Sequence, residues 1–428
     1  MSKGYKSFFA LMLALLIGVC VAILCDVFSA QEFVSTKRTV VVRALAGEYP
    51  LVPVSVTLSG IKIVGDLIPT LRDVSTGVLI PTQLLSRDEK LQLVWIERNL
   101  KRGQTKRYEL VLVKPKALKE VGSAETKQVG NKEVGLAEAK RVNDEVEIFT
   151  NGELVTAYRY SDAPKPYFYP LIGPTGKPVT RHFPMKKDVP GERTDHPHHR
   201  SMWFTFGDVN GVDFWSEGAR CGRIEHRSYE AIESGAVFTR VVARCEWVGS
   251  DGKRLLEDTR ELIVYCVEGM RLMDFNITLM AKDEDVKFGD TKEGMFGLRV
   301  ACSMQVDGGG GHIVNSRGDE NANAWGKRAE WCDYYGRVDG DVVGIAIFDH
   351  PQNFRHPTYW HVRTYGLFAA NPFGVRSFSG SGDGSYVLRK GSSITFRYRI
   401  YIHKGDPKVA DVALAYLAYA EPPQVSFE

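Results

Sequence analysis

The chain has 428 residues, and its 55 Lys and Arg against 52 Asp and Glu give a formal charge of +3. With 44% hydrophobic residues, the composition is that of a folded protein and excludes a disordered chain. The near-neutral charge gives no reason to expect a nucleic-acid partner, and a single long apolar run excludes a membrane protein with several spans.

The N-terminus is first basic and then apolar. Lys3 and Lys6 precede the eighteen-residue run Phe8–Cys25. This order is typical of a secretory signal, and Val-Phe-Ser at 27–29 offers a cleavage site. We therefore predict a signal peptide or an uncleaved anchor at residues 1–30, and export of the rest to the periplasm or cell envelope. An anchor would be the protein's one membrane contact.

Short β-branched runs follow: TVVVR, VPVSVTL, LQLVWIE and YELVLV. Turn residues separate them, which predicts a small β-sandwich-like domain at 31–115. Residues 116–141 are rich in Lys, Glu, Gly and Ala and are expected to form a linker.

From residue 142 to 405 the pattern predicts a larger β domain. Apolar and polar residues alternate at 273–279 and again at 396–402, as in antiparallel strands with one buried face. FTRVVARCEW, ELIVYCV, GLRVACSM and VVGIAIF add four more strand-like runs to this region, and the helical periods of a βαβ fold are missing between the strands. The predicted fold class is all-β, a large antiparallel β-sandwich after a smaller β domain.

One helix is predicted at the C-terminus, in the segment 406–428. Asp406 is its expected N-cap, Pro407 its first residue, and Pro422-Pro423 its end. A structural role, covering a sheet face, is expected for it.

Five cysteines follow the leader, an odd number without a CxxC pair. We expect Cys245, Cys266 and Cys302 to act as small core residues, because they lie in apolar runs. A disulfide stays open as an alternative, with no choice of partners.

Potential site residues are densest between Thr194 and Gly218. Aromatic rings beside convergent polar groups suit a sugar, whose C–H faces stack while its hydroxyls form hydrogen bonds. A purely structural network of Asp–His and Arg pairs is the alternative. The candidates in this segment are Asp195, His196, His198, His199, Arg200, Trp203, Asp213 and Trp215.

A metal is the second alternative for this segment. His196 and His198 form an H-x-H pair, but the next Glu is Glu217, nineteen residues beyond His198. No cofactor is therefore predicted, and a divalent ion held by the two histidines stays an alternative.

Three further segments carry candidates. In 289–301, Glu293 is the proposed general base and Arg299 a substrate-binding group; a surface loop of exposed charges is the alternative. Residues 308–336, which lack a P-loop motif, are expected to be a long loop that brings Trp325 and Lys327 to the site. In 349–374 the candidates are His361 and Arg363. No GxSxG motif or nucleophilic cysteine setting indicates acyl transfer.

These segments resemble a bacterial family, common in planctomycetes and their relatives, that is labelled "methane oxygenase PmoA". The resemblance covers about residues 167–403 and is carried by DHPHHRSMWFTFGDVNGVDFW, GDTKEGMFGLRVA, AWGKRAEWCDYYG and HPTYWHVRTYGLFAANPFG. A methane monooxygenase A subunit has several membrane spans, whereas this chain has at most one, so hydropathy argues against the activity in the label.

The resemblance implies a β-supersandwich similar to galactose mutarotases and some polysaccharide lyases, in which a concave sheet presents His, Arg and a carboxylate to a sugar ring. His196, His199, Glu293 and His361 fit these roles by their chemistry.

We therefore predict an exported carbohydrate-active protein, an isomerase, epimerase or lyase. Glu293 would be the base, His196 or His199 the acid, and His361 an orienting group. The alternatives are a non-catalytic glycan-binding protein and a metal-dependent oxidoreductase. The sequence sets no oligomeric state. The predicted substrate-binding residues are Arg200, Trp203, Asp213, Trp215, Arg299, Trp325, Lys327 and Arg363.

Overall fold

The computed structural model describes residues 33–61, 63, 65–87, 89–114 and 136–428. The predicted leader and most of the predicted linker lie outside these residues. Within them, almost all regular structure is antiparallel β-strand, and no helix is long and apolar enough to cross a membrane.

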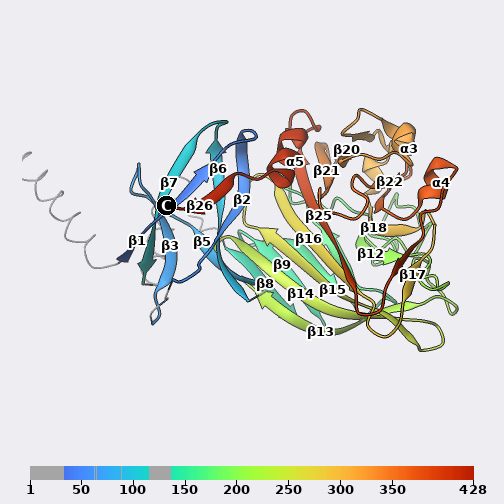
Figure 1. Ribbon diagram of the computed structural model, residues 1–428. Helices are drawn as coiled ribbons and strands as arrows, with labels where there is room; N and C mark the ends of the chain where they lie inside the picture. The colour runs from blue at the N-terminus through green and yellow to red at the C-terminus, as the bar shows by residue number, and fades with distance from the viewer. Residues whose placement is uncertain (1–32, 62, 64, 88, 115–135) are drawn as a thin grey trace, which may run out of the picture.

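Two eight-stranded sheets form the body of the molecule (Figure 1). We name them after a central strand. The β12 sheet contains, in spatial order, β22 (Tyr359–Val362), β23 (Leu367–Asn371), β18 (Gly294–Arg299), β12 (Met202–Phe206), β11 (Tyr167–Leu171), β10 (Glu153–Arg159), β9 (Glu145–Thr150) and β8 (Ala137–Val142). The β16 sheet contains β13 (Arg223–Glu233), β14 (Phe238–Val248), β15 (Arg254–Tyr265), β16 (Arg271–Met280), β25 (Ser393–Lys404), β21 (Asp341–Asp349), β20 (Trp331–Val338) and β19 (His312–Asn315).

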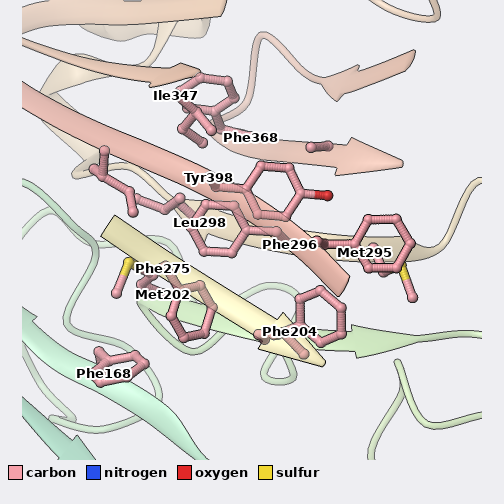
Figure 2. Close-up of a cluster of buried hydrophobic side chains, with 14 of the residues drawn as sticks. Phe168, Met202, Phe204, Phe275, Met295, Phe296, Leu298, Ile347, Phe368 and Tyr398 are labelled. Atoms are coloured by element: carbon pink, nitrogen blue, oxygen red, sulfur yellow. The ribbon is translucent and has the colours of Figure 1, made fainter. Parts of the chain in front are cut away.

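The two sheets pack face to face through their alternate residues. Phe168 in β11 contacts Phe275 in β16 with ring centroids 5.5 Å apart, and Phe296 in β18 stacks on Tyr398 in β25 at 5.0 Å. Figure 2 shows these rings in one continuous buried cluster. The prediction of a large antiparallel β-sandwich is confirmed.

The same alternation decides which residues leave the core. Met202 and Phe204 in β12 are part of the core between the sheets. Side chains of neighbouring residues point to opposite faces of a strand, so Trp203 lies on the outer face of the β12 sheet. The same rule places Arg299 in β18 and His361 in β22 on that outer face.

The N-terminal residues form a smaller two-sheet unit. Its core includes Val42, Val54, Trp95 and Leu110. The last strand of the chain pairs with the first strand here, which brings the C-terminus back to this unit. The two sheets are β26 (Gln424–Phe427), β1 (Phe33–Arg43), β7 (Thr105–Val113), β3 (Ile68–Asp73) and β4 (Leu79–Ile80), and β2 (Tyr49–Thr57), β6 (Lys90–Leu100) and β5 (Thr82–Arg87).

This smaller unit and helix α5 (Val412–Ala420) cover the outer face of the β16 sheet. Gln83 fixes the contact, because its side-chain oxygen accepts hydrogen bonds from the backbone amides of Val237 and Phe238 at 3.1 and 3.0 Å. The helix start predicted at Pro407 is wrong. Asp406 instead accepts hydrogen bonds from the amides of Lys408 and Val409, which closes a turn before the helix.

Two other expectations are corrected. Residues 308–336 are not one long loop, because β19 and the start of β20 lie within them. Strand β8 begins at Ala137, inside the predicted linker, because it pairs with β9. The remaining elements are β17 (Val286–Phe288), β24 (Tyr386–Leu388), α3 (Val306–Gly309), α4 (Val375–Ser379) and the 3-10 helices Cys302–Met304 and Asn321–Ala324. The five cysteines of the described residues are all free.

Candidate functional site

The candidate site lies on the outer face of the β12 sheet, where residues 180–200 run across it. Backbone bonds hold this segment to β18, since the amide of Arg181 donates to the carbonyl of Arg299 at 3.0 Å. The hydroxyls of Thr180 and Ser201 hydrogen-bond at 2.7 Å. The segment thereby places its histidines over β12 and β18.

Asp195 is the electrostatic centre of this segment. It accepts hydrogen bonds from Arg181 at 2.6 Å and from Arg299 at 2.9 Å, and both arginines are completely buried. Burial alone would raise the pKa of Asp195, but Arg299, His196 and Arg181 together lower it to about 2. The carboxylate is therefore ionised at every physiological pH and acts as a fixed acceptor.

His196 is the exposed histidine bound to this centre. Its Nδ1 lies 2.8 Å from Asp195 Oδ2 and donates to it, which leaves Nε2 without a hydrogen-bond partner among the described residues. Its backbone is in the left-handed region at φ 46°, held there because Arg181 donates to its carbonyl at 2.9 Å. An exposed imidazole oriented by a carboxylate is a suitable acid or base.

His199 is buried directly beneath His196. Their rings stack at 4.8 Å, and His199 stacks in turn on Trp203 at 5.3 Å. Arg299 can only donate, so the 3.1 Å contact with His199 Nδ1 makes that nitrogen an acceptor. Burial, with the nearby cations, lowers the pKa of His199 far below its usual value. His199 is thus a neutral, positioning ring.

Tyr365 joins this centre to a second group of site residues. His196 stacks on its ring at 5.2 Å, and the guanidinium carbons of Arg299 and Arg363 lie 4.8 and 5.6 Å from the ring centre. Burial raises the pKa of Tyr365; Arg363 and Arg299 lower it and the carboxylates of Glu293 and Asp195 raise it, which leaves the pKa above its usual value. The phenol therefore stays protonated and can donate a hydrogen bond.

In the second group, His361 is held by the chain before β18. Its Nδ1 donates to the carbonyl of Lys292 at 2.8 Å, so Nε2 carries the free lone pair. Burial, together with Lys292 and Arg363, lowers the pKa of His361 to about 3. Trp325 meets this ring edge-on at 6.4 Å. His361 is therefore a neutral acceptor at the site.

Glu293 is one-third exposed, with 31% of its side chain accessible. It forms an ion pair with Lys292, and its charge acts on the phenol of Tyr365. The carboxylate is therefore partly accessible to solvent and close enough to act electrostatically on Tyr365, as a general base at this face would be.

The structure therefore brings His196, His199, Glu293, His361, Arg299, Trp325 and Arg363 together on one sheet face. The other candidates have different roles. Trp203 and Trp215 are buried, with 0% and 2% exposure, and cannot stack on a ligand. Both aromatic predictions are corrected, because these rings form a small core under residues 180–200.

Arg200 and Asp213 are used within the fold. Arg200 donates twice to Glu217 at 2.8 Å, and the buried Lys165 completes that ion pair. Asp213 Oδ1 accepts from the amides of Trp215 and Ser216, which closes a turn. Lys327 is exposed. Substrate binding by Arg200 and Asp213 is therefore not supported.

Sequence reasoning missed Arg181 and Tyr365. Arg181 precedes the first histidine of the cluster, and Tyr365 lies two residues after Arg363, as Arg363 lies two after His361. Strand alternation could not have found Tyr365, because it lies in the turn between β22 and β23, which the hydrogen bond from the Gly366 amide to the Arg363 carbonyl closes.

The metal alternative concerns the pair His196 and His198. His196 and His198 lie with ring centroids 5.7 Å apart, and burial with Lys165 lowers the pKa of His198 to about 4. Within the part of the chain that the structure describes, no group of three or more His, Cys, Asp or Glu is arranged to hold an ion. The pair thus lacks a third ligand there.

An open depression of about 380 Å³ lies elsewhere on the molecule. It is lined by residues that include Glu153, Thr175, Asp341 and Lys404, and it contains none of the site residues.

Fold and site together define an all-β sandwich protein with imidazole, guanidinium and carboxylate groups on an open sheet face. The chain belongs to a family of unknown function, DUF6807, which matches residues 145–416. That description contains no methane oxygenase activity. No curated protein sequence matches the chain.

Solved structures show weak similarity. They include a glycosyl hydrolase family 38 protein from Enterococcus faecalis (11% identity, TM-score 0.40, 91% of this chain, 47% of the other). An α-mannosidase from Enterococcus faecalis V583 is 12% identical with a TM-score of 0.40, and the match covers 91% of this chain and 46% of the other. A variant of a glycoside hydrolase family 97 enzyme from Pseudoalteromonas sp. strain K8 is 11% identical with a TM-score of 0.26, and the match covers 63% of this chain and 34% of the other. The chain spans about half the length of the first two, and with TM-scores below 0.5 none indicates its activity.

Proposed function

We propose that the protein binds a sugar on the outer face of the β12 sheet and converts it by acid/base chemistry, as an isomerase, epimerase or lyase. The observation that carries this proposal is that the Asp195–His196 pair, Glu293 and His361 lie on the same sheet face, where His196 stacks on Tyr365 and the charge of Glu293 acts on that phenol. These groups come from segments about 70 to 170 residues apart in the chain.

Each residue of the site would have its own role in the proposed reaction. Glu293 would take a proton from a ring carbon or hydroxyl. His196, oriented by Asp195, would give a proton from Nε2 when its ring carries both protons, and would keep the Nδ1 proton that it donates to Asp195. His361 would accept a hydrogen bond from a sugar hydroxyl. Tyr365 and Trp325 would contact the C–H face of the ring.

The test is conversion of a panel of mono- and oligosaccharides by the purified protein in D₂O, followed by proton NMR for deuterium uptake, epimers or unsaturated products. We expect Glu293→Gln and His196→Gln each to lower the rate by about 10²-fold or more. Full activity in both folded variants would contradict the roles assigned here.

Matched controls come from the opposite sheet. Glu330 has the same 31% exposure as Glu293 and pairs with Arg317. His312 is exposed and stacks on Tyr335 at 5.2 Å, as His196 does on Tyr365. Glu330→Gln and His312→Gln should leave conversion unchanged.

Two outcomes would favour the other functions. Binding without conversion across the panel supports a non-catalytic glycan-binding protein. Stoichiometric metal in untagged protein, with activity lost on chelation, supports the oxidoreductase.

We propose in addition that the chain is exported. The apolar run Phe8–Cys25 behind two lysines supports this proposal. N-terminal sequencing of protein from the envelope fraction should find cleavage near Ser29, or the intact leader in the membrane; recovery from the cytoplasm alone would contradict export.

A further inference from the structure

We propose that Arg363 is the receptor for an anionic group, so that the ligand of the site is a sugar acid, bound through its carboxylate. This inference rests on the proposed function, and it names the substrate class.

Arg363 is held in place without an anion. Its guanidinium carbon lies 5.5 Å from the ring centre of Trp325 and 5.6 Å from that of Tyr365, between two aromatic residues. Among the described residues its side chain forms no hydrogen bond or ion pair, and it is half-buried. Aromatic contacts fix the guanidinium while its five N–H donors stay available.

The neighbouring arginines on this face differ. Arg181 and Arg299 share Asp195, and Arg200 forms its two bonds with Glu217. Each of these guanidinium groups is bound to a carboxylate of the protein, although Nε of Arg299 has no hydrogen-bond partner among the described residues. Since a guanidinium matches a carboxylate through two parallel N–H bonds, the open fork of Arg363 suits a ligand carboxylate.

A second donor supports the same ligand independently. Nε1 of Trp325 is buried and has no hydrogen-bond partner in the described part of the chain, although its ring contacts Arg363. A buried donor without an acceptor destabilises the folded protein unless a bound molecule accepts its hydrogen bond. One ligand oxygen could accept from this indole, and others from Arg363.

The remaining neighbours argue for a sugar rather than a small inorganic anion. His361 Nε2 is an acceptor, because Nδ1 donates to Lys292. It therefore suits a hydroxyl and not an anion. A molecule with one carboxylate for Arg363, several hydroxyls for His361 and an apolar ring face for the aromatic side chains would bind to all of these groups.

The experiment is isothermal titration of the full chain with D-glucuronate and D-galacturonate, each against its neutral parent, D-glucose or D-galactose, and against glucose 6-sulfate. We expect the uronates to bind at least about 10-fold more tightly than the neutral sugars, and Arg363→Met to weaken uronate binding by about 10- to 100-fold. Arg363→Lys should recover only part of this loss, because it keeps the charge and loses the fork.

The matched control is Arg141→Met. Arg141 is exposed and lies 5.3 Å over Tyr229, a similar cation–aromatic contact outside the site. Its removal should leave uronate binding unchanged.

Unchanged uronate binding by Arg363→Met, or equal binding of neutral sugars and uronates, would overturn the inference while the proposed function stands. Tighter binding of the sulfated sugar would overturn the choice of carboxylate. If no sugar of any series binds or is converted, the proposed function itself fails.

Discussion

The outer faces of the two large sheets differ in how their charges are paired. On the β16 sheet, Arg399 donates twice to Asp274 at 2.6 and 2.8 Å, under Tyr419 of helix α5. On the β12 sheet, Arg363 has aromatic neighbours but no carboxylate partner among the residues that the structure describes, and Nε2 of His196 has no hydrogen-bond partner among them. One face is covered and holds Arg399 in a buried ion pair, although the hydroxyl of Tyr419 has no hydrogen-bond partner among the described residues. The other face is open and leaves Arg363 without a carboxylate from the described part of the chain.

This difference shows that alternation of residues along a strand is not sufficient to form a ligand-binding site. Both faces carry charged and aromatic residues at period two, but the smaller unit and α5 bury one of them. A buried charge needs its partner, whereas a group at an open face can keep donors free for a ligand. Function is therefore expected on the β12 sheet and stability on the β16 sheet.

The largest effect should come from breaking the covered face. Arg399→Met leaves the buried carboxylate of Asp274 without its cation and should lower the free energy of unfolding by about 3–5 kcal/mol. Urea titration measures this. The exposed pair Arg389–Asp285 is the control, since Arg389→Met should lower the free energy of unfolding far less than Arg399→Met does. Equal losses in the two variants would remove the contrast between covered and open pairs.

The next effect is a pH dependence from the open face. The pKa of His361 is lowered to about 3, so below the unfolded value near 6.5 only the unfolded chain takes up this proton. Stability then falls with falling pH, by about 1.4 kcal/mol per pH unit for this group, and levels off near its folded pKa.

His361→Asn should therefore flatten the stability curve between pH 6 and 4 by about 1.4 kcal/mol per pH unit. At pH 8 the two proteins differ only in packing. Denaturant titrations at several pH values measure this, and parallel curves would show that His361 takes up a proton in the folded state.

A smaller effect belongs to Asp195, whose pKa is lowered to about 2 by Arg299, His196 and Arg181 against the effect of burial. The stability that the folded protein gains from this lowered pKa is present above pH 4 and is lost as the pH falls through about 2. With a third of the side chain exposed, we expect about 1 kcal/mol. Asp195→Asn should lose this part of the acid dependence; an unchanged acid limb would contradict the assignment.

The smallest effect concerns Trp325. Trp325→Phe removes the orphan indole donor and weakens the cation–aromatic contact, so uronate affinity should fall about 2- to 5-fold. Trp331→Phe on the β16 sheet is the control. An affinity change that is equal in both variants would count against a specific role for Trp325.

Alternation along the strands predicted the sandwich, because burial of one face leaves a period-two pattern in the sequence. Residue chemistry also selected His196, His199, Glu293 and His361, which share one face. The pattern could not show that Trp203 and Trp215 would be buried, since the segment that covers them is bound through contacts such as Asp195 with Arg299, 104 residues apart. Ion pairs between residues far apart in the chain decide which charged groups remain available to a ligand, and a single sequence does not show which residues pair.

The most direct test of the open face is hydrogen–deuterium exchange of the full chain with and without the tightest-binding sugar of the panel. We predict slower exchange in residues 181–200, 291–299 and 359–366, with the segments of the β16 sheet unchanged. Protection confined to the β16 sheet, or to the smaller N-terminal unit, would contradict the assignment of function to the β12 sheet.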